Sequence, residues 1–220
     1  MAVNANLNRL IPAIVSYITE NGGYVTKTKL LKLLYLFDVE YYRLHRQIFS
    51  GFQWKFFHLG PWTREFDPVL ETLFAHEALV ASPSSRPEYD TKFYRTPAPC
   101  DIQGILESFK DEAALKIILD TWGESSTGEL LDHVYFRTEP MEHGVRNQPL
   151  DFTTIPEDSP TAYRRRPSGK TKAEIDAARR KLHANHGTSA HSTRIQPPLT
   201  PPRYDDEFFQ ALSKLDGNEL

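Results

Sequence analysis

The chain has 220 residues, of which 40% are hydrophobic and 25% are charged, which is ordinary for a globular protein in water. Its formal charge of −3 and its pI near 6.2 argue against a protein devoted to phosphate backbones. The single cysteine, Cys100, excludes an intramolecular disulfide and a zinc cluster held by thiolates. Because the N-terminal residues lack both a basic region and a continuous apolar run, we expect no signal peptide, no membrane partner and a cytoplasmic location.

Composition changes twice along the chain. Residues 1–155 show the apolar periodicity of one packed domain, and the net charge up to residue 159 is −7. By contrast, residues 156–203 have few large apolar side chains, and between residues 160 and 195 there are nine lysines and arginines but two acids. Such a segment buries too little surface to offset the entropy of ordering its backbone. We therefore predict a flexible, basic and proline-rich linker.

The last part, residues 204–220, has apolar side chains at helical spacing: Phe208, Leu212 and Leu215, with Phe209 beside them. We predict a short amphipathic helix that docks on a partner by its apolar side. Folding of this segment back onto its own domain is an alternative that the sequence leaves open.

The domain opens with an amphipathic helix within residues 6–23. Its apolar residues from Leu7 to Ile18 fall on one helical face, and the pair Gly22 and Gly23 provides a stop. We expect Pro12 in the first turns, where the missing N–H group costs least.

Residues 25–47 carry the strongest helical pattern of the chain, with Thr26 or Thr28 as the N-cap. The apolar stripe of this second helix is unusually wide, because Leu31, Tyr35 and Leu36 extend it. A helix that is apolar over most of its circumference is surrounded by other elements. We therefore predict that it runs through the centre of the core.

Three further patterns follow. Residues 51–62 favour short extended segments that end at Gly60 and Pro61. A helix, with a break near Pro68, is expected within residues 63–79. Two strand-like runs, residues 79–82 and 91–96, flank a loop rich in proline and serine and predict a β-hairpin.

Two more helices complete the domain. One lies within residues 101–125, is continuous or broken, and closes at Gly123. The other covers residues 126–136, with Ser125, Ser126 or Thr127 as its cap. The predicted fold class is mainly α (α+β), a compact helical domain with a small antiparallel β-hairpin or sheet.

No catalytic pattern emerges from the sequence. It contains no GxGxxG, Walker loop, HExxH or GxSxG motif, and Cys100 has no adjoining base. A metal site drawn from Asp132, His133, Glu139 and His143 matches no defined ligand spacing. We expect no catalytic residue, no metal and no cofactor, and hence a protein that is not an enzyme.

Asp38 is the most unusual acid, because its neighbours on the second helix are nearly all apolar or aromatic. A buried carboxylate needs hydrogen-bond donors or a cation. We predict a structural hydrogen-bond anchor, with a general base as the alternative.

The order helix, helix, hairpin is that of a winged helix-turn-helix, which raises the possibility of a DNA-binding regulator. The second helix would then enter the groove. Its first half carries only three basic residues, Lys27, Lys29 and Lys32, in an otherwise apolar run. Such a helix is too apolar to face a groove, so DNA stays a weaker alternative as partner.

Three ordered blocks within residues 6–150 resemble the SocA-like antitoxin family, also called the Panacea domain. The blocks are KLLKLLYLFDVEYY (residues 29–42), IFSGFQWKFFHLGPWTREF (48–66) and GESSTGELLDHVYFRTEPM (123–141). The motif and core residues that carry the resemblance are Leu33, Leu34, Tyr35, Asp38, Trp54, Gly60 and Pro61. The resemblance implies a mainly helical domain with a small sheet that neutralises a protein toxin by direct contact. It implies a toxin encoded nearby as the partner.

Residues 27–66 hold 11 aromatic side chains, more than we expect a core of this size to bury completely. Since Tyr, Trp and Arg dominate binding hot spots, the residues predicted to contact the toxin are Tyr42, Arg43, Trp62, Arg64 and Phe66, together with Phe208, Phe209 and Leu212 of the C-terminal segment. The acidic domain would attract a basic toxin. A homo-oligomer, a DNA-binding autorepressor and a proteolytic adaptor for the toxin stay open as alternatives.

Overall fold

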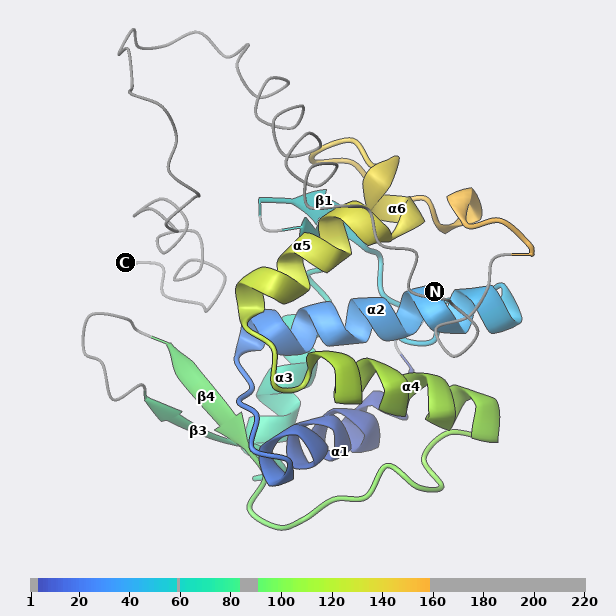
Figure 1. Cartoon of the computed structure of the whole chain (residues 1–220). Coiled ribbons are helices and arrows are strands. Elements are labelled where there is room, and N and C mark those ends of the chain that lie inside the picture. Colours follow the sequence, from blue (N-terminus) through green and yellow to red (C-terminus); the bar gives the residue numbers. More distant parts are fainter. Residues whose placement is uncertain (1–3, 59, 84–90, 159–220) are drawn as a thin grey trace, which may run out of the picture.

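The computed structural model describes residues 4–58, 60–83 and 91–158 (Figure 1). The predicted mainly α (α+β) class is confirmed, since helices dominate this part of the chain and two small antiparallel hairpins accompany them. The predicted linker beyond residue 158 and the predicted C-terminal helix lie outside the described residues. In chain order the elements are α1 (Leu7–Glu20), α2 (Lys27–His45), β1 (Lys55–Phe57), β2 (Gly60–Trp62), α3 (Phe66–Ala75), β3 (Val80–Pro83), β4 (Lys92–Arg95), α4 (Phe109–Trp122), α5 (Thr127–Arg137), α6 (Glu139–Glu142) and the 3-10 turn η1 (Phe152–Thr154).

Helix α2 lies at the centre of the molecule, as predicted, between α4 on one side and α5 on the other (Figure 1). Every residue from Thr28 to Glu40 is buried, so this part of the helix has no solvent face. The N-cap is Thr26, whose hydroxyl accepts a hydrogen bond from the backbone N–H of Lys29 at 3.2 Å. No helix in the described ranges is long and apolar enough to cross a lipid bilayer.

The aromatic segment after α2 forms a hairpin that the sequence pattern did not predict. Strands β1 and β2 pair in antiparallel register, with Lys55 opposite Trp62 and Phe57 opposite Gly60. The Gly-Pro pair therefore starts the second strand, and the prediction that it ends the extended segment is wrong. Gly60 has a φ of 89°, which glycine adopts without steric cost.

The predicted hairpin is confirmed as β3–β4, with Val80 opposite Arg95. It is joined to the connection between α1 and α2 by the N–H of Tyr94, which donates to the carbonyl of Val25 at 2.8 Å. Helix α3 runs through Pro68 without a break, because this proline lies in the first turn, where its N–H is not needed.

Helix α4 is shorter than the range that the pattern indicated, and α5 agrees with its predicted range to within one residue. Residues 101–108 form turns, and α4 starts only after Ser108, whose hydroxyl accepts from the N–H of Lys110 at 3.2 Å. Helix α5 opens with a capping box in which Ser126 and Glu129 bind each other's backbone N–H groups. The short elements α6 and η1 had no recognised sequence signal.

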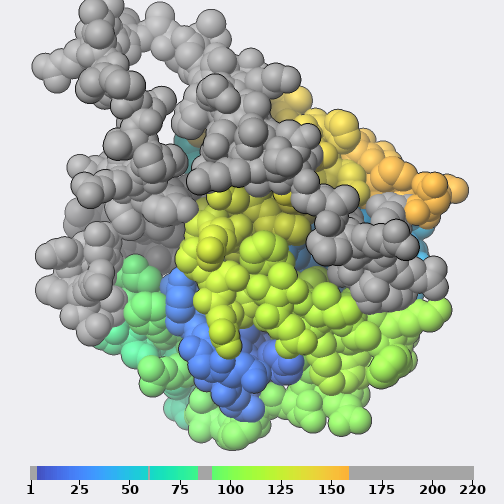
Figure 2. Space-filling model, viewed as in Figure 1, coloured from blue at the N-terminus to red at the C-terminus, as the bar shows by residue number. Residues whose placement is uncertain are grey.

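Helix α1 approaches the end of α4 very closely. A Cβ atom on Gly23 would lie 2.3 Å from the carbonyl oxygen of Gly123 and 2.7 Å from a methyl group of Ile18, so only glycine fits there. Figure 2 shows this region, where the blue N-terminal segment meets the yellow-green chain at the start of α5. The Lys29 ammonium, which donates to the carbonyls of Gly123 at 2.7 Å and Ser125 at 2.8 Å, fastens α2 to the same turn.

Candidate partner-binding site

The residues that carry the family resemblance come together in one buried network around α2. Lys32 of the first block is completely buried, and its ammonium donates to the carbonyl oxygen of Pro61, in the second block, at 2.6 Å. Burial lowers the pKa of Lys32 from 10.5 to about 7. This hydrogen bond holds strand β2 against the central helix.

Tyr35 joins all three blocks. Its ring meets the ring of Trp54 at 5.4 Å in an edge-to-face arrangement, which stabilises aromatic pairs beyond their area of contact. Its hydroxyl lies 3.1 Å from the hydroxyl of Thr138, at the junction of α5 and α6. Burial strongly raises the pKa of Tyr35, so the hydroxyl stays protonated.

Asp38 makes the contacts expected of a structural anchor. Its carboxylate accepts from the backbone N–H of Ser50 at 2.9 Å, from the hydroxyl of Ser50 and from the indole N–H of Trp54 at 2.7 Å. The side chain is 1% exposed, and burial raises its pKa from 3.8 to about 6 although these hydrogen bonds act in the opposite direction. The carboxylate fixes the loop that leads from α2 into β1.

We expect Trp54→Phe to lower the free energy of unfolding at pH 7 by about 1.5–3 kcal/mol, because a hydrogen bond to a charged group is lost. The loss should be smaller at pH 5, below the pKa of about 6, where Asp38 is protonated and needs the indole donor less. Urea unfolding at both pH values measures the difference. Trp122→Phe is the matched control, since the indole of Trp122 stacks on His133 at 4.5 Å. Equal losses at the two pH values for Trp54→Phe would contradict the coupling to Asp38.

Two residues predicted to contact a toxin are buried instead. The side chain of Arg43 is 0% exposed and forms ion pairs with Glu40 and Glu139, which tie α2 to α6. Phe66 is also 0% exposed, because it starts α3 and packs on Phe52 with ring centroids 6.4 Å apart. For both, the expectation of a place on the binding surface is corrected to a place in the core.

The other candidates differ in exposure. Arg64 has a side chain that is 82% exposed, and Tyr42 and Trp62 are half-buried. Tyr42 lies partly against Phe152, with ring centroids 5.6 Å apart. Phe208, Phe209 and Leu212 lie outside the described residues.

The outer side of the β1–β2 hairpin, which we call the hairpin face, consists of Lys55, Phe57 and Trp62. Side chains alternate across a strand, and Phe56 and Pro61 point inward and are buried, which leaves the three others outward. The rings of Phe57 and Trp62 lie 5.4 Å apart and are both half-buried. The inner network of Lys32 and Pro61 thus presents an aromatic pair on a rigid support.

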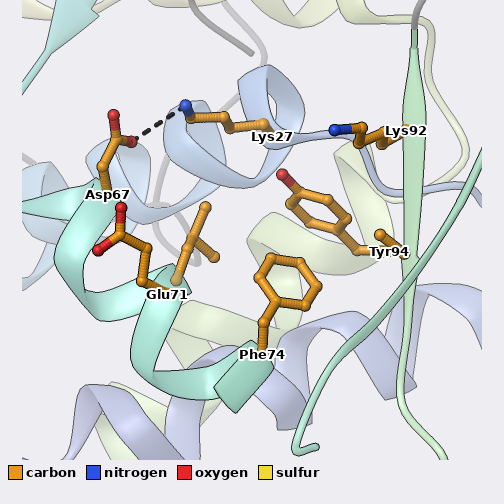
Figure 3. A pocket seen from close by; sticks show the side chains of 8 residues that line it. Lys27, Asp67, Glu71, Phe74, Lys92 and Tyr94 are labelled. Carbon is orange, nitrogen blue, oxygen red and sulfur yellow. Dashed lines mark ion pairs between the residues drawn. The ribbon is translucent and has the colours of Figure 1, made fainter. Parts of the chain in front are cut away.

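A cleft of about 310 Å³ opens between α3 and strand β4 (Figure 3). We call it the α3 cleft. Phe74 and Tyr94 form its apolar floor, with ring centroids 5.1 Å apart. The rim is charged: Lys27 pairs with Asp67 at 3.1 Å, and Lys92 lies on the opposite side. An apolar floor with charges of both signs around it suits a short peptide segment with an apolar anchor.

Sequence reasoning missed the structural role of the lysines of α2. The sequence pattern presents Lys29 and Lys32 as basic residues of a possible DNA-binding helix, whereas both are 0% exposed in the structure. Burial also lowers the pKa of Lys29, to about 8, and its ammonium lies 4.2 Å from the centre of the Tyr24 ring. Their burial could have been predicted from their position within the unusually wide apolar stripe of this helix.

The residues considered for chemistry do not form a metal-binding group in the described part of the chain. Within the described residues there is no group of three or more His, Cys, Asp or Glu side chains placed to hold a metal ion. His133 stacks on Trp122, and Cys100 is half-buried, with its backbone N–H donating to the hydroxyl of Ser16 at 2.9 Å. Asp38 is enclosed in the network described above.

Comparison with protein-family models, with curated proteins and with solved structures finds no match to this chain.

Proposed function

We propose that the protein is an antitoxin that neutralises a protein toxin, encoded nearby, by direct binding. The observation that carries the proposal is the hairpin face. Three residues of the blocks that carry the resemblance, Lys32, Pro61 and Trp54, hold this hairpin from within. A partially exposed aromatic pair on a rigid support is the composition that dominates protein–protein hot spots.

The α3 cleft adds a second contact region. It is close to the hairpin in the sequence, since α3 follows β2 after a short connection. Its apolar floor would receive one side chain of the toxin, and Lys27, Asp67 and Lys92 would orient the segment around it. Arg64, in the connection between the hairpin and α3, is exposed and offers a guanidinium group to the same partner.

The DNA-binding alternative loses its structural basis at α2. A recognition helix needs basic and polar side chains that reach the groove. Lys29 and Lys32 are buried and hold carbonyl oxygens of the protein itself, while Lys27 is 12% exposed and pairs with Asp67. We therefore propose no nucleic-acid function for this helix.

Co-expression with the product of the neighbouring gene tests the proposal. We expect rescue of growth and co-purification of the two proteins. The double variant Phe57→Ala, Trp62→Ala should lose co-purification, because removing hot-spot aromatics costs about 2 kcal/mol or more each. Phe93→Ala removes a half-buried ring from the other hairpin and is the matched control. A neighbouring product that neither inhibits growth nor co-purifies would refute the antitoxin, and full binding by the double variant would refute the hairpin face.

A further inference from the structure

A second cavity, of about 380 Å³, lies between the C-terminal end of α2 and the start of α4. We call it the Asp111 cavity. Tyr41, His45 and Phe49 form one wall, and Glu107 and Asp111 form the other. Its volume is near the lower end for ligand sites, which suits one long side chain better than a cofactor.

The charged lining of this cavity is mostly acidic, and the imidazole of His45, which also lines it, pairs with the Asp111 carboxylate. Two carboxylates line it, and no lysine or arginine does among the described residues that form its walls. Asp111 is 3% exposed, and its carboxylate lies 2.7 Å from Nε2 of His45. Burial is the largest cause of the raised pKa of the Tyr41 hydroxyl, and the negative charges of Asp111 and Glu107 raise this pKa further. The two carboxylates therefore act electrostatically on the aromatic wall.

The aromatic wall has the geometry that a planar cation uses. The rings of Tyr41 and His45 are 4.3 Å apart at 36°, and Phe49 meets Tyr41 edge-to-face at 5.2 Å. A guanidinium group stacks on such faces and donates in a planar fork to carboxylates, which an ammonium group cannot do. Asn6, which also lines the cavity, makes no capping hydrogen bond with its side chain.

The surface next to the cavity indicates that a cation bound there would be a side chain of a partner protein and not a free small molecule. Phe109 directly follows the cavity-lining Ser108 and is 83% exposed, the highest exposure of a large apolar side chain among the described residues. An exposed ring beside an acidic cavity gives a partner protein an apolar contact next to its charge, which a small free cation would not use. The excess of acidic residues, −7 up to residue 159, favours a basic partner in the same way.

We infer that the Asp111 cavity binds the guanidinium group of an arginine side chain from a partner protein. The inference rests on the proposed function only for the identity of that partner. The guanidinium would stack on Tyr41 and donate to Asp111 and Glu107. An anion is the opposite possibility, because α4 begins at this cavity and a helix N-terminus attracts negative charge. The two carboxylates oppose it.

A small probe tests the chemistry on the full chain alone, without the toxin. N-acetyl-arginine amide should bind saturably and shift the NMR signals of the Tyr41 and His45 rings. N-acetyl-citrulline amide, which has the same shape without the charge, and inorganic phosphate should not. Saturable shifts with citrulline or phosphate, or none with arginine, would overturn the inference.

Two variants assign the binding to the carboxylates. Glu107→Gln, at an exposed position, and Asp111→Asn should each weaken the probe about tenfold or more. Glu112→Gln is the control, because Glu112 lies in the same first turn of α4 but pairs with Lys116 at 2.9 Å outside the cavity. Unchanged affinity in Glu107→Gln, or an equal loss in Glu112→Gln, would contradict the assignment.

A last pair of measurements identifies the source of the arginine. The full chain carries Arg164, Arg165 and Arg166 beyond the described residues. If their replacement by glutamine makes the probe bind more tightly, the chain's own arginines compete for the cavity and the assignment to a partner is wrong. If Glu107→Gln weakens co-purification of the toxin as it weakens the probe, the assignment to a partner is supported. If the hairpin-face variants alone keep full binding, the result contradicts the proposed role of the hairpin face and leaves the inference about this cavity unchanged.

Discussion

Replacing Arg43 by methionine is expected to lower the free energy of unfolding by about 3–5 kcal/mol, the usual cost of removing one partner from a buried ion pair. Its side chain is 0% exposed and pairs with Glu40 on the same helix and with Glu139 at the start of α6. Without the guanidinium, the Glu40 carboxylate keeps its desolvation cost but loses this compensating charge. Urea unfolding followed by circular dichroism measures the loss.

Arg64→Met is the matched control, because it removes the same guanidinium from a side chain that is 82% exposed. A surface ion pair such as that of Arg64 and Glu65, 3.7 Å apart, contributes little, so we expect a change of about 0.5 kcal/mol or less. Equal effects of the two substitutions would show that Arg43 is not a buried charge. The pair also separates stability from binding, because only Arg64 should affect a partner without affecting folding.

The second large effect is a dependence of stability on pH that comes from Lys32. In the folded protein its pKa is lowered to about 7, whereas the unfolded chain keeps the ordinary 10.5. Between these values the unfolded state binds more protons than the folded state, so the free energy of unfolding rises as the pH rises. The slope from one such lysine is at most about 1.4 kcal/mol per pH unit. Below pH 7 both states are protonated and the slope disappears.

Lys32→Met should remove most of this rise between pH 7 and pH 9.5 while keeping a side chain of similar length in the core. Lys29 acts with the same sign above its pKa of about 8, so a part of the slope remains. Lys110→Met, at an exposed position in the first turn of α4, should leave the wild-type profile unchanged. Chemical denaturation at half-unit pH intervals gives the three profiles. A Lys32→Met profile parallel to the wild type would contradict the assigned role.

The sequence predicted the helices well because helix caps and apolar spacing depend on residues that are close together in the chain. Thr26 and Ser126 cap helices whose first turns follow them directly, and the apolar spacing of α1 and α2 identifies both as helices. The β3–β4 hairpin was evident from two strand-like runs around a proline-rich loop. The β1–β2 hairpin was missed because Gly60 and Pro61 usually mark an end, whereas here Lys32 binds the Pro61 carbonyl and holds the pair in a strand.

The sequence identified candidate binding residues by their residue type, but it did not predict which of them are exposed. Trp62 and Arg64 lie on the surface, while Phe66 and Arg43 are in the core. All four belong to a short aromatic and basic stretch with no local feature that separates them. The Asp111 cavity was invisible for a related reason, since His45 and Asp111 are 66 residues apart and meet only when α4 packs beside α2.

The sequence was sufficient to predict the five longer helices, the start of several of them, and the place of the second helix in the core. It determined these features because periodicity and capping act between residues a few positions apart. Apart from Asp38, the burial of the charged residues followed from the tertiary structure and not from the sequence pattern. Lys29 and Arg43 meet their partners Gly123, Ser125 and Glu139 across 94 to 96 residues of chain. Burial of a charge depends on what covers it, and α2 is covered by α4, α5 and strands β2 and β4, which the sequence of α2 does not contain.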